Sequence, residues 1–299
     1  MYEQIRNNKV KSFLLCFFFA ALVLLLGWVF GEVSGFGYWG LVIAAVIAIL
    51  MSVGAYYHSD KIVLKMSKAR PLEKHEYPFL FHSLEGLSIA AGLPVPRAYI
   101  IDDTAPNAFA TGRNPQHAVI CVTTGLLQKL NRLELEGVIA HEMSHIKNYD
   151  ILLMTMTVVM VGIVALLSDW MYRVFWYGGG RKRGRGRSGG GGGGAAIIML
   201  IALLLAILAP LIAQLIRLAI SRRREFLADA DGAYLTRYPE GLANALEKLD
   251  ADYEPLEVAN KATAHLYIIN PLREHRRKFN SLFSTHPPTP ERIAALRAM

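Results

Sequence analysis

Four long hydrophobic stretches constrain this chain more than any other feature of its sequence. They cover residues 13–30, 38–57, 151 to about 172, and 195–220. At about 1.5 Å per residue in a helix, each is long enough to cross or nearly cross a hydrocarbon core of roughly 30 Å. With 53% hydrophobic and only 19% charged residues, the chain is too apolar for an ordinary soluble protein. We therefore predict a mainly α-helical integral membrane protein with about four transmembrane helices.

The charges beside the first two hydrophobic stretches predict their orientation. Basic residues flank the pair on its outer sides, at Arg6, Lys9, Lys11, Lys61, Lys65, Lys68 and Arg70, whereas the loop 31–37 carries only Glu32. By the positive-inside rule, both flanks lie in the cytoplasm. The first stretch is long and aromatic-rich and lacks a clear small-x-small exit, so we interpret it as an uncleaved anchor. Residues 1–65 are therefore expected to form an N-terminal transmembrane hairpin.

The second hydrophobic pair, within residues 151–220, encloses a low-complexity loop at residues 178–194. This loop holds five basic residues, all between Arg181 and Arg187, and then six consecutive glycines. If both segments cross the membrane, the loop lies outside, against the charge rule; the alternative is a hairpin that only dips into the bilayer, and we favour crossing. An Arg/Gly run can bind nucleic acid, but without interleaved aromatic residues it fits a solvated tether near lipid headgroups. No nucleic-acid partner is expected.

The strongest chemical signal is the pattern HEMSH at residues 141–145. Histidines four residues apart lie one turn apart on the same face of a helix, here with a carboxylate beside the first. Asn131 and Glu134 resemble a helix-capping pair upstream, and apolar residues then recur at helical spacing. We therefore predict a helix that carries a zinc site, with Glu142 as its base.

A catalytic zinc usually has three protein ligands and an open fourth position, so His141 and His145 require a third ligand downstream. Residues 221–229, SRRREFLAD, supply it, since Glu225 and Asp229 are also four residues apart in a helical context. Glu225 would bind the metal, and Asp229 would orient a histidine. The alternative is a solvated Glu225 paired with neighbouring arginines, but the upstream histidine pair favours the ligand. We expect one zinc ion per chain.

Four segments together resemble the HtpX-type membrane zinc metalloproteases, relatives of the CAAX prenyl endopeptidases within the wider gluzincin group. These segments are residues 107–112, 141–145, 221–229 and 285–288, which occur in the order that the family shows. The resemblance spans nearly the whole chain. It implies an α+β zinc peptidase domain with a small β-sheet, assembled from residues 66–150 and 221–299 and interrupted by the hydrophobic hairpin at 151–220.

The reaction implied is metal-assisted hydrolysis of peptide bonds. Zinc would polarise the scissile carbonyl and lower the pKa of a water molecule, while Glu142 takes the proton of that water and passes it to the leaving amine. By the family's C-terminal pattern, His286 would help stabilise the oxyanion and Arg292 would contact the oxyanion or the substrate. For both residues the alternative is an ordinary surface or capping role.

Two strands are predicted between the second hydrophobic stretch and the zinc helix. Residues 97–101 and 118–123 are β-branched or apolar runs bounded by Pro and Gly. In zinc peptidases a strand edge near the metal commonly holds substrate in extended form, because backbone pairing tolerates any side chain. The family pattern places Asn107 where it would hydrogen-bond that substrate; the alternative is a turn residue after Pro106.

Together these features predict a multi-pass zinc endopeptidase of the bacterial inner membrane, with its active site facing the cytoplasm. The resemblance implies cleavage of misfolded or damaged membrane proteins in envelope quality control and stress response. The expected partners are membrane-protein or unfolded polypeptide substrates and the lipid bilayer. One alternative is a CAAX-type prenyl protease, although such relatives generally have more spans than the four available here. Another is a non-proteolytic membrane scaffold or chaperone with a structural zinc, against which the presence of Glu142 argues.

Overall fold

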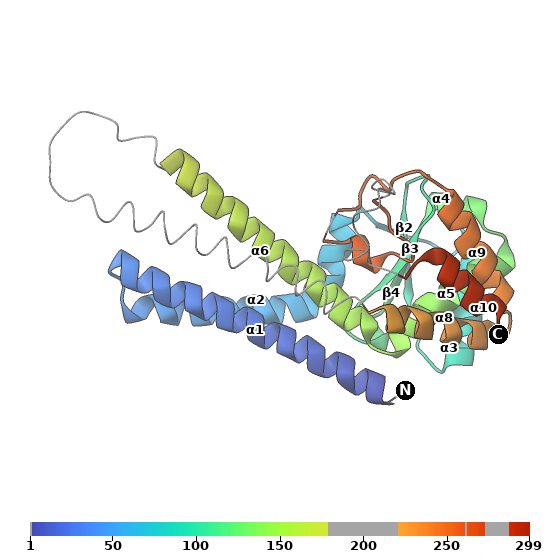
Figure 1. Ribbon diagram of the computed structural model, residues 1–299, viewed down its shortest axis with the longest axis horizontal. Helices are drawn as coiled ribbons and strands as arrows, with labels where there is room; N and C mark the ends of the chain where they lie inside the picture. Colours follow the sequence, from blue (N-terminus) through green and yellow to red (C-terminus); the bar gives the residue numbers. More distant parts are fainter. Residues whose placement is uncertain (1, 179–220, 261, 273–286) are drawn as a thin grey trace.

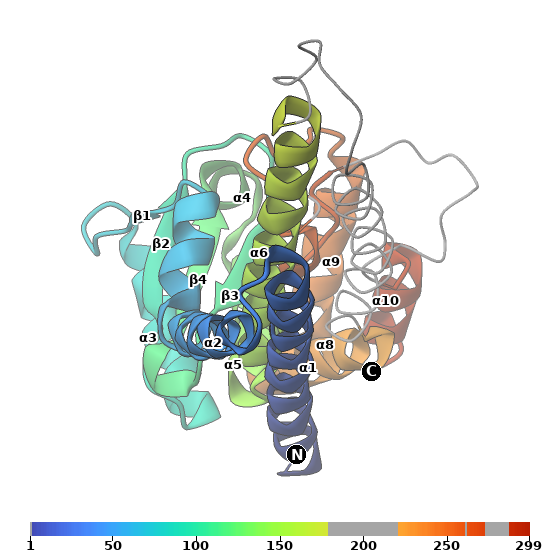
Figure 2. The same ribbon diagram turned by 90° about the vertical axis from the view of Figure 1, so that its left-hand side faces the viewer.

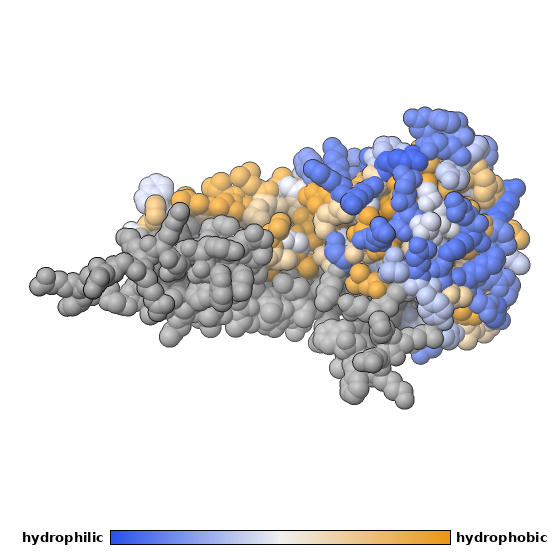
Figure 3. Space-filling model, turned by 90° about the horizontal axis from the view of Figure 1, so that it is seen from above, coloured by the Kyte–Doolittle hydropathy of each residue, from blue (hydrophilic) through white to orange (hydrophobic). Residues whose placement is uncertain are grey.

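A computed structural model describes residues 2–178, 221–260, 262–272 and 287–299 of this protein. Long helices project from one side of a domain in which shorter helices surround a small sheet (Figure 1). Hydrophobic residues follow the projecting helices, whereas the exposed face of the domain is mostly hydrophilic (Figure 3). The predicted combination of a mainly helical membrane protein and a small sheet is therefore confirmed.

The N-terminal hairpin consists of α1 (Tyr2–Ser34) and α2 (Tyr38–Met66), which lie side by side (Figures 1 and 2). Small residues let the two backbones approach closely. A Cβ atom added to Gly27 would lie 2.0 Å from the Cβ of Ala44, and one added to Gly40 would lie 2.6 Å from the carbonyl oxygen of Gly27. Such small-residue contacts are a common way for membrane helices to pack. Both helices are long and apolar enough to cross a membrane.

The third projecting helix is α6 (Asp150–Gly178). Its first turns are buried by protein, since Leu153 and Met160 pack in one cluster with Leu15 and Phe19 of α1. Among the described residues, two helices are candidate membrane spans, or three if α5 and α6 form one broken span. The fourth predicted segment, 195–220, lies outside the described residues, as does the Arg/Gly-rich loop beyond Gly178.

The sheet has four strands in the order β1-β2-β4-β3. Their bounds are β1 (Arg70–Pro71), β2 (Arg97–Ile101), β3 (Ala108–Thr111) and β4 (Val119–Thr123). The central pair β2 and β4 is parallel, and each central strand pairs antiparallel with a short edge strand. Both predicted strands are confirmed. The segment between them adds β3, which the sequence analysis had not assigned as a strand.

Helix α5 (Arg132–Lys147) lies at the centre of the domain and packs against α3, α8, α9 and β3. The other elements around the sheet are α3 (Pro78–Ala91), α4 (Thr124–Lys129), α8 (Arg222–Thr236), α9 (Pro239–Ala251), α10 (Thr289–Arg297) and the 3₁₀ turns η1 (Pro115–His117) and η2 (Ala264–Leu266). Val138 and Ile139 of α5 are fully buried in the main core with Leu242 and Leu246 of α9. The core thus fixes α5 on several sides at once.

Gly137 allows α5 and α9 to come into close contact. A Cβ atom at this position would lie 2.7 Å from the backbone nitrogen of Leu242, which cannot move aside without shifting α9. We expect Gly137→Ala to lower the free energy of unfolding by about 1–3 kcal/mol, although alanine favours helix more than glycine does. Gly86→Ala in α3 is the matched control, because nothing lies within 4 Å of its added Cβ. Chemical denaturation of both variants in detergent would test this, and equal stability of the two would contradict it.

Candidate metal centre and active site

Helix α5 begins with the predicted capping pair. The side chain of Asn131 accepts a hydrogen bond from the backbone N–H of Glu134 at 3.1 Å, and the Glu134 carboxylate accepts one from the backbone N–H of Asn131 at 2.9 Å. This capping box is confirmed as the start of the helix. It fixes the register in which His141 and His145 follow on one face.

His141, His145 and Glu225 form the one group among the described residues that could hold a metal ion. Their candidate ligand atoms all lie within 4.8 Å of one another, and all three side chains are buried. The two Nε2 atoms are 3.2 Å apart, and the Glu225 oxygens lie 3.7 and 3.8 Å from them. Two nitrogens on a tetrahedral zinc, each at about 2.0–2.1 Å, would be about 3.3 Å apart. The spacing of the two histidines therefore fits zinc.

A carboxylate faces the other nitrogen of each imidazole. Nδ1 of His145 is hydrogen-bonded to Asp150 at 2.9 Å, and Nδ1 of His141 lies 2.9 Å from Asp229, close enough for such a bond although the two groups are not aligned for it. A neutral ring that donates its Nδ1 proton to such a carboxylate keeps only a lone pair on Nε2. With both rings neutral, the two lone pairs face each other, which is repulsive unless a proton or a metal cation lies between them. The donor set thus fits a metal on chemical as well as geometric grounds.

The surroundings of His145 favour a positive charge. Burial alone would lower its pKa, but the hydrogen bond to Asp150 and the charges of Glu225, Asp150 and Glu142 outweigh burial and raise the pKa to about 9. At neutral pH the ring of the metal-free protein therefore carries a proton, which a metal must displace. The same negative charges that retain this proton would attract the metal cation.

Arg292 of α10 holds Asp229 in place. Its Nε donates to one carboxylate oxygen at 2.7 Å, one terminal nitrogen donates to the other at 2.6 Å, and the second terminal nitrogen donates to the carbonyl of Ile268 at 2.9 Å. Burial alone would raise the pKa of Asp229, but Arg292 and then His141 hold it well below its usual range. The Asp229 carboxylate is therefore charged and fixed where it faces His141.

Glu142 lies next to the first ligand and is almost fully buried. The backbone N–H of Ala110 is near enough to the carboxylate to act on its pKa, but neither carboxylate oxygen has a hydrogen-bond partner of normal geometry among the described residues. Burial raises the pKa of this carboxyl group, while the charges of His141 and His145 act to lower it. A carboxylate with a raised pKa beside a metal site is suited to accept and release a proton.

Gly232 brings α8 close enough to α5 to complete the site. A Cβ atom at this position would lie 3.0 Å from the backbone nitrogen of His141, so only glycine lets the helices approach this closely without a shift. Glu225 and Asp229 lie on the same helix, one turn apart and both buried. The predicted i, i+4 pair on α8 therefore faces the predicted i, i+4 pair on α5.

Strand β3 presents part of its backbone at the edge of the sheet. The carbonyl of Asn107 accepts from Thr123 in β4, whereas the carbonyl of Ala108 accepts from Ile268 on the opposite side. In an antiparallel strand the backbone N–H and C=O groups of alternate residues point to opposite neighbours in the sheet. The N–H and C=O of Ala110 therefore point away from β4, like the carbonyl of Ala108. The Ala110 amide is one of the groups that act to lower the pKa of Glu142, so this edge lies beside the active site.

Asn107 itself makes contacts within the domain. Its side-chain amide donates to the carbonyl of Ile269 at 3.2 Å, and its side-chain oxygen accepts from the N–H of Ala108 at 3.1 Å. The side chain is only 3% exposed. In this structure it supports the start of β3 and the segment around Ile269.

One predicted site residue is not placed by the structure, and one residue of the site was not predicted. His286 lies outside the described residues, so its role stays a prediction. Asp150, the partner of His145, was missed by the sequence analysis. The available signal was weak: a single acidic residue at the start of a hydrophobic stretch, five residues after the second histidine.

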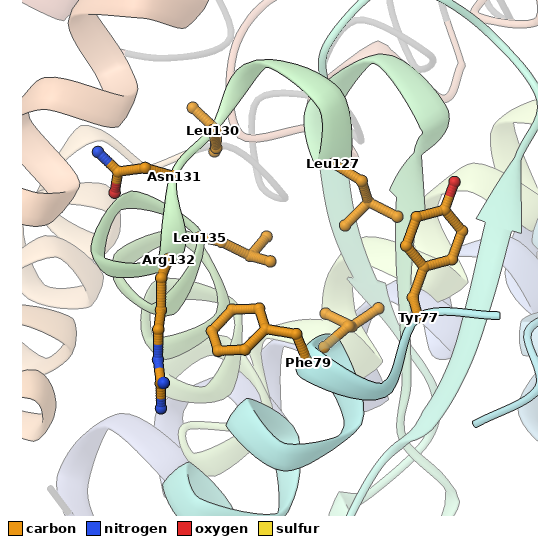
Figure 4. A pocket seen from close by; sticks show the side chains of 8 residues that line it. Tyr77, Phe79, Leu127, Leu130, Asn131, Arg132 and Leu135 are labelled. Atoms are coloured by element: carbon orange, nitrogen blue, oxygen red, sulfur yellow. The ribbon is translucent and has the colours of Figure 1, made fainter. Parts of the chain in front are cut away.

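A separate pocket of about 150 Å³ opens where α3, α4 and α5 meet (Figure 4). It is lined by Tyr77, Phe79, Leu80, Leu127, Leu130, Asn131, Arg132 and Leu135. The α5 residues in this lining belong to its first turns, whereas the metal ligands follow in the second half of the helix. None of the predicted site residues lines this pocket, so we do not assign it to the active site.

The ion pair of Arg292 with Asp229 allows a test of how the site is held together. In the metal-free protein, Arg292→Met should lower the free energy of unfolding by about 3–5 kcal/mol, because it leaves the buried Asp229 charge without its partner. Arg297→Met on the same helix is the control, since this exposed residue pairs with Glu240 and Glu247 at the surface and its loss should lower stability far less. Denaturant titration measures both, and similar losses for the two variants would contradict this assignment.

Comparison with known proteins agrees with this geometry. Residues 78–299 match peptidase family M48. A protein named protease HtpX homolog from Dictyoglomus thermophilum is 46% identical over 298 residues, covering 100% of this chain and 94% of the relative. The protease HtpX homolog of Thermococcus sibiricus is 45% identical over 290 residues, covering 96% of this chain and 94% of the relative.

A solved structure shares the fold. The crystal structure of S. mikatae Ste24p superimposes with a TM-score of 0.52 at 22% sequence identity, covering 99% of this chain and 67% of that one. The predicted resemblance to HtpX-type proteases is confirmed by the sequence relatives. The chain therefore belongs to peptidase family M48 and is a metallopeptidase whose metal site is formed by His141, His145 and Glu225.

Proposed function

We propose that this protein is a zinc endopeptidase that cleaves misfolded or damaged membrane proteins at the cytoplasmic face of the bacterial inner membrane, as part of protein quality control under stress. The observation that carries the proposal is the pair of Nε2 atoms 3.2 Å apart with the buried, unbonded carboxylate of Glu142 next to them. A metal site with its own proton acceptor serves hydrolysis, whereas a structural site has no use for that acceptor.

Zinc is the metal that two imidazoles and one carboxylate with an open position favour. When bound, it supplies Lewis acidity to the scissile carbonyl and to water. His141, His145 and Glu225 would hold it, and Asp229 and Asp150 would keep the two rings in the binding tautomer. Glu142 would accept the proton of the attacking water and deliver it to the leaving amine.

Arg292 would act through Asp229. By the family pattern this residue would contact the oxyanion or the substrate, but its guanidinium makes two short hydrogen bonds to Asp229 and one to Ile268, and is 1% exposed. These contacts favour a role in fixing the Asp229 carboxylate against His141. Oxyanion stabilisation by His286 remains part of the proposal.

Substrate would bind in extended form along the outer edge of β3. The N–H and C=O of Ala110 point away from β4 beside Glu142, as an added strand requires, but Ala110 is fully buried here, so substrate would have to displace part of the chain from this edge. Backbone hydrogen bonds do not depend on which side chains the substrate carries. This mode of binding therefore suits unfolded polypeptides of varied sequence. The internal contacts of Asn107 would then support the strand that receives the substrate.

The membrane arrangement of the proposal rests on charge and length. The basic residues around the N-terminal hairpin favour a cytoplasmic position for both of its ends, and the domain follows the second end. With the segment at 195–220, four spans would anchor the enzyme. An active site at the foot of these helices would meet membrane proteins where they leave the bilayer.

If the proposed activity is correct, hydrolysis should require both the metal and Glu142, whereas metal binding should not require Glu142. Chelation should abolish cleavage of an unfolded model protein by the full chain in detergent, and added zinc should restore it. Glu142→Gln should lower kcat by about 10²–10⁴-fold with zinc affinity nearly unchanged, because it removes the proton acceptor and leaves the ligands in place. Glu136→Gln on the same helix is the control and should keep full activity. Zinc binding by every variant with no cleavage by any would refute the protease assignment.

If substrate pairs with β3, cleavage should depend on the backbone N–H groups of the substrate close to the cleavage site. A peptide substrate with one N-methylated amide at a residue that pairs with Ala110 should lose about 3–10-fold in kcat/KM, the value of one hydrogen bond. N-methylation of a distant residue in the same peptide should have little effect. A scan of the methyl group along the peptide would show this dependence on position, and a flat profile would argue against strand addition.

A further inference from the structure

A buried polar side chain from the first membrane helix lies next to the metal centre. Asn8 of α1 is 1% exposed, whereas its neighbour Asn7 on the same turn is exposed. Burial of an amide requires hydrogen bonds for its two N–H donors and its carbonyl oxygen. Each of these groups has a partner, and none of the partners belongs to α1 itself.

The partners of Asn8 lie just after the end of α5, at the start of α6 and on α8. Its Nδ2 donates to Oδ1 of Asp150 at 2.6 Å and to the carbonyl of Asn148 at 2.9 Å. Its Oδ1 accepts from Arg224 of α8 at 3.3 Å. Asp150 in turn faces His145 through its other oxygen, and Arg224 directly precedes Glu225. One amide thus links the neighbours of two metal ligands.

The same amide stabilises a sharp bend in the chain. The axes of α5 and α6 meet at 82°, and Tyr149 between them has a φ of 59°, in the left-handed region. A helix end of this kind leaves carbonyl groups without partners inside the helix, and Asn8 satisfies that of Asn148. Lys9 of α1 lies 4.3 Å above the ring of Tyr149. Two consecutive residues of α1 therefore contact the bend that places Asp150 against His145.

We propose that Asn8 is a positioning residue for the metal centre: by holding Asp150 against His145, it makes metal affinity depend on the first membrane helix. This inference rests on the proposed zinc site. The side chain does not touch the metal ligands, so its effect passes through Asp150. The N-terminal hairpin is then part of the support of the active site as well as an anchor.

The experiment uses the full chain in detergent and measures the zinc dissociation constant by competition with a chromophoric chelator. Asn8→Leu keeps the branched shape of the side chain and removes its hydrogen bonds; Asn8→Ala is the second variant if leucine does not fold. We expect zinc binding to weaken about 5–10-fold, at or just below the lower end of the range known for groups that orient metal ligands. Asn7→Leu, on the exposed side of the same turn, should bind zinc as the unmodified chain does.

A combined variant separates positioning from a general structural role. Asp150→Ala alone should weaken zinc binding by about 10–100-fold, and adding Asn8→Leu to it should change binding less than twofold, because the two act on the same ligand. A lower Tm of the metal-free Asn8 variants with unchanged zinc affinity would overturn the proposal, as would full additivity with Asp150→Ala. Zinc affinity is measured without substrate, so an inactive but zinc-binding protein would refute the proposed function and leave this inference standing.

Discussion

Two carboxylate–imidazole pairs set the geometry on which the rest of the site depends. Asp229 and Asp150 each face the Nδ1 atom of a histidine, which directs both Nε2 atoms toward one point. A histidine pair on one helix does not ensure this alone, because each ring can turn about its side-chain bonds. The fold must therefore bring α8 to one ring and the start of α6 to the other. The close approach at Gly232 and the bend after α5 are the means by which it does so.

Local signals made much of this protein predictable from sequence. The length of the hydrophobic stretches predicted α1, α2 and α6, and the capping pair predicted the start of α5. The β-branched runs predicted the two central strands. The metal group was predictable because His141 and His145 are one helical turn apart, as are Glu225 and Asp229. A pair of histidines and a pair of carboxylates, each at this spacing in one apolar chain, left little choice for His141, His145 and Glu225.

The unpredicted parts depend on contacts between distant segments. Asp150 faces His145 only because the helix axis turns by 82° at a residue with positive φ. Asn148 is a helix-end signal, but it does not indicate the direction in which the next helix leaves. The substrate roles that the family pattern gave to Arg292 and Asn107 stay predictions, and the contacts of these residues within the domain were not foreseen from sequence. Strand β3 was not assigned because it has only four residues, two of them alanine, which is too short a run to indicate a strand by itself. It forms through its pairing with β4.

The polar contacts at the foot of the long helices explain why anchor and enzyme are not independent parts. Buried charges are tolerated only when they are paired and hydrogen-bonded, and here Arg224 of α8, Asp150 of α6 and Asn8 of α1 meet one another. Separation of any one helix would leave a buried charge or amide without its partners, at a cost well above that of a lost surface contact. The hairpin, the bend and the metal-bearing helices should therefore hold one arrangement together. Movement of the N-terminal hairpin relative to the domain would therefore change the geometry of the metal site.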